Sequence, residues 1–292
     1  MPGDPGSVTG AESPRPWWRV DDPGRRLTGK RAFVTGAGTT RGADPIGIGE
    51  AIAVLFAAQG ARVAIADISA ERAAATLDLV DAIGGEAIVT TGDLTRVDDN
   101  ARCVGEAAAA FGGLDTVVNC VALSTGSGSP VDVDLDDWDA VMAVNLHAAV
   151  LTARHAIPHL QAARGGSNDN ISSIAASRGH GAGAYAASKA ALGGLTRDWA
   201  YVHGRDGIRV NAILAGHVYA PMGDQGGPEY RERRRRAGLL PTEGVAWDVA
   251  WPAVFLASEE SRWITGVELP VDAGSTSSGP FALQLLNDRD PA

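Results

Sequence analysis

The chain has 292 residues, a mass of 30.0 kDa and 45% apolar residues, which suffices for a sizeable buried core. Its formal charge of -10 and isoelectric point near 5.0 give no overall attraction to nucleic acid or to an anionic membrane, so neither is expected as a partner. We find no signal segment and no uncharged apolar run of about 18 residues, and we therefore expect a cytoplasmic protein.

The first 26 residues are rich in proline, glycine and charge, which predicts an extension outside the folded domain, with Trp17 and Trp18 available to anchor its end. Cys103 and Cys120 lie in apolar segments without metal-type or redox-type spacing. We expect these cysteines to be reduced and buried, and we expect no metal site.

From Arg31 onward, short apolar runs alternate with alanine-rich helical stretches, which predicts an α/β protein with a doubly wound parallel sheet flanked by helices. The predicted strands are 31–35, 62–66, 87–91, 116–119, 208–213 and 268–271, with one more before Ser172. The predicted helices are 48–59, 70–83, 97–111, 136–161, 185–203 and 245–256. No repeat divides this series, so we predict a single domain over residues 27–275 and a C-terminal tail over 276–292.

Residues 217–244 interrupt the alternation with the run GDQGGPEY and a charged helix, and so long an excursion predicts a substrate lid. Its run RERRRR at 231–236 has no interleaved aromatic residues, so we expect a solvated helix face rather than a phosphate grip. Residues available to line the pocket are Tyr219, Met222 and Tyr230 in the lid and the hydroxyl-rich stretch 124–129.

The first strand, RAFVT, is followed by Gly36 and then by the helix start GIGEAIAVLF. A glycine turn between a strand and a helix aims the helix N-terminus at a pyrophosphate, so we assign cofactor contacts to the turn and helix start, Gly36, Gly47, Ile48 and Gly49. By itself the glycine spacing also fits an ordinary turn. Residues 37–46 make this loop unusually long, and we expect the inserted TTRGADP to bulge outward at the cofactor's edge.

Asp67 ends the second strand, where a carboxylate can bind both hydroxyls of an adenosine ribose; a simple helix cap is the alternative. The carboxylate would repel a 2'-phosphate, and the next residue, Ile68, supplies no cation, so we expect NAD(H) rather than NADP(H). Arg41, inside the long loop, could fold back over the ribose and reverse this preference.

The run YAASK places Tyr185 and Lys189 on one helical face, where an ammonium lowers the pKa of a nearby phenol and makes it a usable general acid/base. Ser173 precedes the tyrosine in NISS, and Asn145 lies in the preceding long helix.

These motifs together resemble the short-chain dehydrogenase/reductase family. The resemblance covers about residues 27–274 and also includes GDL at 92–94, Asn119, IRVNAILAGHV at 208–218 and ITGVELPVDAG at 264–274. It implies a single-domain Rossmann fold, a nicotinamide cofactor, and a homotetramer or dimer formed through helices 136–161 and 185–203.

The resemblance also implies residue roles. Tyr185 would exchange a proton between a secondary alcohol and a ketone, Lys189 would lower its pKa and hold the nicotinamide ribose, and Ser173 would bind the substrate oxygen. Asn145 would position a relay water. The remaining cofactor contacts would be Asp93 and Leu94 to adenine, Asn119 beside the adenosine and the Val218 backbone to the carboxamide. Two alternatives stay open: Ser172 as the active hydroxyl, and Asn145 as a helix-kink residue.

Several positions depart from the family pattern. Cys120 and Val121 alter the floor beneath the adenosine, and Ala215 and Ala220 replace a usual proline and threonine near the nicotinamide. Asn168 and Asp169 stand in a strand that should be apolar on both faces, so Asp169 must find partners, stay wet or weaken the fold. The competing functions are an NADPH-dependent ketoreductase resembling 3-oxoacyl reductases and a non-catalytic nucleotide-binding scaffold or sensor.

Overall fold

The computed structural model describes residues 25–179, 181–223 and 226–289. Apart from Arg25 and Arg26, the predicted N-terminal extension and its two tryptophans lie outside the described residues.

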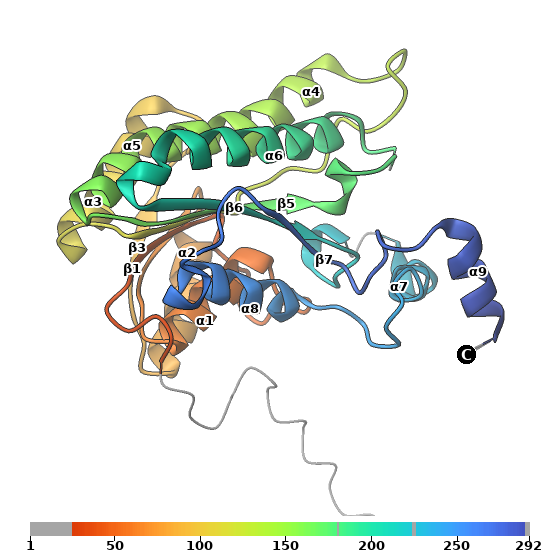
Figure 1. Ribbon diagram of the computed structural model, residues 1–292, viewed down its shortest axis with the longest axis horizontal. Helices are drawn as coiled ribbons and strands as arrows, with labels where there is room; N and C mark the ends of the chain where they lie inside the picture. The colour runs from red at the N-terminus through yellow and green to blue at the C-terminus, as the bar shows by residue number, and fades with distance from the viewer. Residues whose placement is uncertain (1–24, 180, 224–225, 290–292) are drawn as a thin grey trace, which may run out of the picture.

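A seven-stranded parallel sheet forms the centre of the molecule (Figure 1), as the alternating pattern predicts. Its strands are β1 (Arg31–Thr35), β2 (Arg62–Asp67), β3 (Glu86–Thr91), β4 (Thr116–Asn119), β5 (Gly166–Ser173), β6 (Ile208–Ala215) and β7 (Glu268–Val271). The strand order is β3-β2-β1-β4-β5-β6-β7, so the winding direction reverses between β1 and β4. In open α/β sheets a ligand binds outside the carboxyl ends of the strands at such a reversal.

Helices cover both faces of the sheet (Figure 1). One face carries α1 (Ile48–Ala58), α2 (Ala70–Ala82) and α8 (Ala246–Ala257). The other carries α3 (Val97–Phe111), α5 (Ala148–Ala162) and α6 (Gly183–His203). Most of α1 is buried, because α2, α8 and the sheet enclose it on nearly all sides. Its apolar sequence, IGEAIAVLFAA, therefore needs no polar face.

The long helix expected over residues 136–161 is interrupted. It consists of α4 (Leu135–Met142), a π-helical segment (Ala143–His147) and α5. The combined run Leu135–Ala162 is long and apolar enough to cross a membrane by length and composition alone. Here it packs against α3, α6 and strands β4 and β5, as a helix of the domain does.

The polar residues of strand β5 are divided between the two faces of the sheet, because successive side chains of a strand point to opposite faces. On the α6 side, the Asn119 amide donates to the Oδ1 atoms of Asn168 and Asn170, at 3.0 and 2.9 Å. On the α8 side, the Ser167 hydroxyl donates to Asp169 Oδ2 at 2.7 Å. Asp169 is completely buried and its Oδ1 has no partner among the described residues. On the α6 side, the Asn170 amide also donates to the Thr196 hydroxyl of α6 at 2.9 Å.

Two helices stand apart from the layers, α7 (Gly227–Arg235) and α9 (Pro280–Arg289), side by side in Figure 1. Arg236 joins them, because its Nη2 donates to the carbonyl of Asn287 at 3.0 Å. Several apolar side chains of α9 are exposed to solvent in the single chain: Phe281 is 74% exposed, and Leu285 and Leu286 are also exposed.

Candidate active site

The predicted site residues converge at one edge of the sheet. Because the strands are parallel, their carboxyl ends share this edge, which the reversal between β1 and β4 divides. The residues at or just after these strand ends are Gly36 (β1), Asp67 (β2), Asn119 (β4), Ser173 (β5) and Val218 (β6). The sequence therefore identified a single spatial site from segments spread over most of the chain.

The glycine turn leaves the helix N-terminus open to a ligand. Gly36 has φ of +63°, and a Cβ atom there would lie 2.7 Å from the Cα of Val121. A Cβ at Gly49 would lie 2.2 Å from the Gly36 carbonyl oxygen, whereas one at Gly47 would meet nothing within 4 Å. This open space at the start of α1, next to the half-buried Ile48, fits the pyrophosphate of a dinucleotide.

The inserted loop bulges outward as predicted, since residues 40–42 and 44 are exposed. Arg41 forms an ion pair with Asp78 on α2. Its guanidinium is therefore engaged by an exposed carboxylate of α2, which argues against a contact with the ribose.

Asp67 is held by the loop and by α2. Its Oδ2 accepts a hydrogen bond from the Gly38 N–H at 3.0 Å, and its Oδ1 accepts one from the Ser69 N–H at 3.0 Å. Arg72 Nη2 lies 3.8 Å from Oδ2 and donates to the Gly38 carbonyl at 3.3 Å. Sequence reasoning missed this arginine; its position one helical turn after the cap residue Ser69 could have identified it. Ile68 is 67% exposed and offers no charge.

The remaining predicted adenosine contacts have partners within the protein. Asp93 Oδ1 accepts hydrogen bonds from the N–H and hydroxyl of Thr95, at 3.0 and 2.6 Å. Leu94 is buried in the cluster that contains Cys103. Asn119 is buried and its amide nitrogen faces β5, so it braces the strand ends.

Three of the predicted catalytic residues lie on α6 and at the end of β5. Lys189 Nζ is 5.7 Å from the centre of the Tyr185 ring and donates to the Ile171 carbonyl at 2.7 Å. Ser173 is near enough to Tyr185 to lower the pKa of the phenol, and its Oγ accepts from the Ala175 N–H at 3.2 Å. The Ser172 hydroxyl donates instead to the Lys189 carbonyl at 2.9 Å. Because Ser172 faces the helix backbone, the geometry favours Ser173 as the active hydroxyl.

The protonation of Tyr185 differs from the prediction. Burial raises the pKa of Tyr185, while the hydrogen bond from Ser173 and the charge of Arg234 lower it. Burial also lowers the pKa of Lys189 to about 8. The expected lowering of the Tyr185 pKa by Lys189 is therefore wrong for this arrangement, because both groups lose water and the amine is directed to the Ile171 carbonyl.

Asn145 lies in the π-helical segment, and its side-chain amide binds both backbone groups of Leu123. Its Oδ1 accepts from the Leu123 N–H at 2.7 Å, and its Nδ2 donates to the Leu123 carbonyl at 2.9 Å and to Ser188 Oγ at 3.0 Å. These contacts support the alternative role of Asn145, as a residue that stabilises an irregular stretch of the helix.

Two further positions were singled out from the sequence, Val218 at the predicted nicotinamide end and Cys120 beneath the predicted adenosine. The Val218 N–H donates to the Gly216 carbonyl at 2.9 Å, and the Val218 carbonyl accepts from Arg234 Nη2 at 3.0 Å. Cys120 is half-buried, and desolvation raises the pKa of its thiol to about 11.

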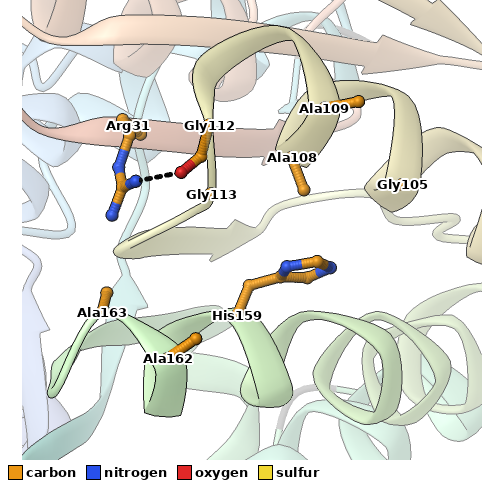
Figure 2. A pocket seen from close by; sticks show the side chains of 9 residues that line it. All are labelled: Arg31, Gly105, Ala108, Ala109, Gly112, Gly113, His159, Ala162 and Ala163. Atoms are coloured by element: carbon orange, nitrogen blue, oxygen red, sulfur yellow. Dashed lines mark hydrogen bonds between the residues drawn. The ribbon is translucent and has the colours of Figure 1, made fainter.

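A different pocket, of about 480 Å³, lies between the C-terminal ends of α3 and α5 (Figure 2). It is lined by glycines and alanines together with Arg31 and His159, at the amino end of the sheet. None of the predicted cofactor or catalytic residues lines it. Among the described residues, no group of three or more His, Cys, Asp or Glu side chains could hold a metal ion.

Comparison with known proteins places this geometry in a family. A family model described as enoyl-(acyl carrier protein) reductase matches residues 42–276. Glucose 1-dehydrogenase of Gluconobacter oxydans (strain 621H) is 34% identical over 263 residues, which cover 88% of this chain and 95% of that protein.

Solved structures agree. Carveol dehydrogenase from Mycobacterium avium in complex with NAD has a TM-score of 0.81 at 29% identity, covering 87% of this chain and 99% of that one. A structure from Agrobacterium tumefaciens assigned to 2-deoxy-D-gluconate 3-dehydrogenase, with bound NADP, has a TM-score of 0.78 at 30% identity, covering 88% and 100%. This chain belongs to the short-chain dehydrogenase/reductase family, as an oxidoreductase of the short-chain alcohol dehydrogenase type that uses a nicotinamide cofactor.

Proposed function

We propose that this protein interconverts a secondary alcohol and a ketone with NAD(H), using Tyr185 as general acid/base. The observation that carries the proposal is the contact between Ser173 and Tyr185 beside the buried Lys189. It supports Tyr185 as the proton donor and Ser173 as the hydrogen-bond donor to substrate, at the carboxyl edge of the sheet, where the glycine turn leaves space for a dinucleotide.

The bound nicotinamide supplies the hydride acceptor or donor. In oxidation, the Tyr185 oxygen takes the hydroxyl proton of the alcohol; in reduction, it returns a proton to the carbonyl oxygen. The Ser173 hydroxyl donates to the substrate oxygen and stabilises the charge that develops there. Lys189, with a pKa of about 8, exchanges protons near neutral pH, and we propose that Asn145 holds the water that links it to solvent.

The cofactor contacts are proposed as a set: Gly36, Gly47, Ile48 and Gly49 at the pyrophosphate, Asp67 and Ile68 at the ribose, Asp93, Leu94 and Asn119 around the adenosine, and Lys189 and Val218 at the nicotinamide end. NAD(H) is proposed because Asp67 carries its charge at the end of β2, where it would repel a 2'-phosphate. The alternative, an NADPH-dependent ketoreductase acting on oxoacyl groups, is favoured by one observation, the guanidinium of Arg72 beside Asp67.

One assay tests the reaction and the cofactor together. Secondary alcohols, including cyclic alcohols and sugars, are offered with NAD and with NADP, and the corresponding ketones with NADH and NADPH, while absorbance reports the reduced cofactor. Turnover with NAD(H) that Tyr185→Phe abolishes supports the proposal. Cofactor binding without turnover across the whole panel would favour the scaffold or sensor.

We also propose a cytoplasmic homotetramer or dimer built through helices 136–161 and 185–203, with 217–244 as the substrate lid of one domain over 27–275. Apolar side chains exposed on α5 and α6 support the interface: Val150, Tyr201 and Val202. Tyr201 is 87% exposed in the single chain.

A further inference from the structure

The arginine-rich helix α7 is exposed, as its sequence predicts, and it also makes specific contacts with residues outside the helix. None of its residues is buried, yet three of its arginines contact residues outside the helix, Arg235 by donating to the Pro241 carbonyl at 2.8 Å. Arg231 stacks 3.4 Å from the centre of the Tyr219 ring and pairs with both carboxylate oxygens of Glu243, at 2.7 and 2.5 Å. Arg234 donates from Nη2 to the carbonyl of Val218 at 3.0 Å.

The guanidinium of Arg234 occupies a closely fitted position. A Cβ atom at Gly223 would lie 2.5 Å from its Nη2 and 2.9 Å from its Cζ, so any larger residue there would displace it. The ring of Tyr230, one turn earlier on α7, lies 5.7 Å from the same Cζ. Backbone, aromatic ring and hydrogen bond therefore fix where this charge sits.

This position connects the helix to the catalytic residues. The Val218 loop follows β6 at the same edge of the sheet as Ser173, so the bond to Val218 holds the guanidinium of Arg234 at the edge that carries the predicted catalytic residues. Its charge lowers the pKa of Tyr185, less than burial raises it. The other titratable groups that act on or face Tyr185 are Lys189 from α6 and Cys120 after β4. Lys189 directs its amine to the Ile171 carbonyl, and Arg234 on α7 is a second cation that acts on the phenol.

We propose that Arg234 is a positioning residue of the reaction: its bond to Val218 fixes α7 against the site and holds a positive charge that favours the phenolate of Tyr185. The proposal rests on the function proposed above, because it assigns Tyr185 the acid/base role. It predicts two separable effects of removing the guanidinium, one on the order of α7 and one on the ionisation of Tyr185.

The order of α7 is measured on the apoprotein by amide hydrogen exchange. Arg234→Gln is expected to speed exchange of the amides of α7 by about tenfold, because the helix loses its bond to Val218. Arg233→Gln is the matched control: Arg233 is exposed on the same helix, and its removal changes the net charge equally. Equal exchange in wild type and Arg234→Gln would overturn the anchoring role.

The ionisation of Tyr185 is measured without turnover. The tyrosinate absorbance of each protein during an alkaline titration, minus that of the same protein carrying Tyr185→Phe, isolates this phenol. Arg234→Gln is expected to move its titration upward by about 0.5 pH unit, with Arg234→Lys restoring most of the shift and Arg233→Gln causing none. An unchanged titration in Arg234→Gln would overturn the electrostatic role.

Steady-state kinetics add a third readout. The alkaline shift should reappear in the pH profile of alcohol oxidation and lower kcat more than it raises KM. A rise in KM confined to substrates that carry a carboxylate, with the pH profile unchanged, would show that Arg234 binds substrate and would overturn the positioning role. Absence of all turnover in wild type would contradict the proposed function, whereas the exchange and titration measurements would still decide the role of Arg234.

Discussion

Arg72 Nη2 lies 3.8 Å from Asp67 Oδ2, at the junction of β2 and α2. The arginine side chain is 51% exposed and the aspartate side chain 4% exposed. A ligand that approaches this junction therefore meets the exposed guanidinium of Arg72 before the buried carboxylate of Asp67, so we expect both residues to influence the cofactor preference.

Changing these charges should alter cofactor use in opposite directions. Asp67→Asn is expected to lower kcat/KM for NAD by about tenfold or more, since a charge-assisted hydrogen bond contributes about 1.5–3 kcal/mol. Arg72→Gln should lower kcat/KM for NADP about tenfold and change that for NAD little. Initial rates with each cofactor provide the measurement.

Arg41→Gln is the matched control for Arg72→Gln, because Arg41 pairs with Asp78 on α2. It should leave both values within about twofold of wild type. A large loss of NADP use in Arg41→Gln, with Arg72→Gln unaffected, would contradict this assignment.

The direction of the Tyr185 pKa predicts how pH affects the two reaction directions. Burial raises this pKa, so the phenol dominates at neutral pH. Reduction needs the phenol and should proceed at pH 7, whereas oxidation needs the phenolate and should accelerate as pH rises above 7. Initial rates in both directions from pH 6 to 10 test this expectation.

Tyr185→Phe is the reference for that profile. It should lower both rates by about 10²- to 10⁴-fold and remove the alkaline rise in oxidation. Quenching of tryptophan fluorescence by NADH should show that the variant still binds cofactor. An oxidation rate that stays flat with pH in the wild type would contradict the role of the Tyr185 phenolate.

Removing the Asn145 side chain should destabilise the protein. Asn145→Ala leaves both backbone groups of Leu123 without their partner, so we expect a loss of about 2–3 kcal/mol in the free energy of unfolding. Ser188→Ala removes only one of the bonds made by Asn145 and should cost about 1 kcal/mol. Urea denaturation followed by circular dichroism measures both.

Activity then separates the two roles of Asn145. If it also holds the relay water, Asn145→Ala should lose at least about tenfold in kcat under conditions where it is fully folded. Full kcat in the folded variant would restrict Asn145 to shaping the helix and positioning Leu123.

Asp169 should make stability depend on pH. Its burial raises the pKa to about 7 in the folded state, above the unfolded value near 4. As pH rises from 4 to 7 the unfolded chain ionises while the folded one holds its proton, so this group lowers the free energy of unfolding progressively. Asp169→Asn should remove a penalty on the order of 4 kcal/mol at most, reached above pH 7.

Denaturation at several pH values between 4 and 8 measures the difference between wild type and Asp169→Asn. The stabilisation should be small at pH 4 and largest at pH 8. Asp81→Asn, at an exposed position, should show no such growth. A difference that is constant across this range would mean that Asp169 does not titrate there.

The sequence was sufficient for the fold, and it predicted which residues would meet at one edge of the sheet. Strand and helix periodicities are local, so the order of elements and most boundaries follow from them. Gly36, Asp67, Ser173 and Val218 meet because parallel strands must end at one edge. Tyr185 and Lys189 share a face because of their spacing on a helix.

Tertiary structure decided which partner each polar group has. The sequence pointed to Arg41 as the cation near Asp67, whereas in the structure Arg41 pairs with Asp78 and Arg72 lies beside Asp67. The Asn119 amide donates to Asn168 on β5, and Arg234 on the exposed helix α7 donates to the Val218 carbonyl. The direction of the Tyr185 pKa likewise depends on burial. Desolvation and long-range pairing depend on atoms distant in the chain, and no local pattern specifies them.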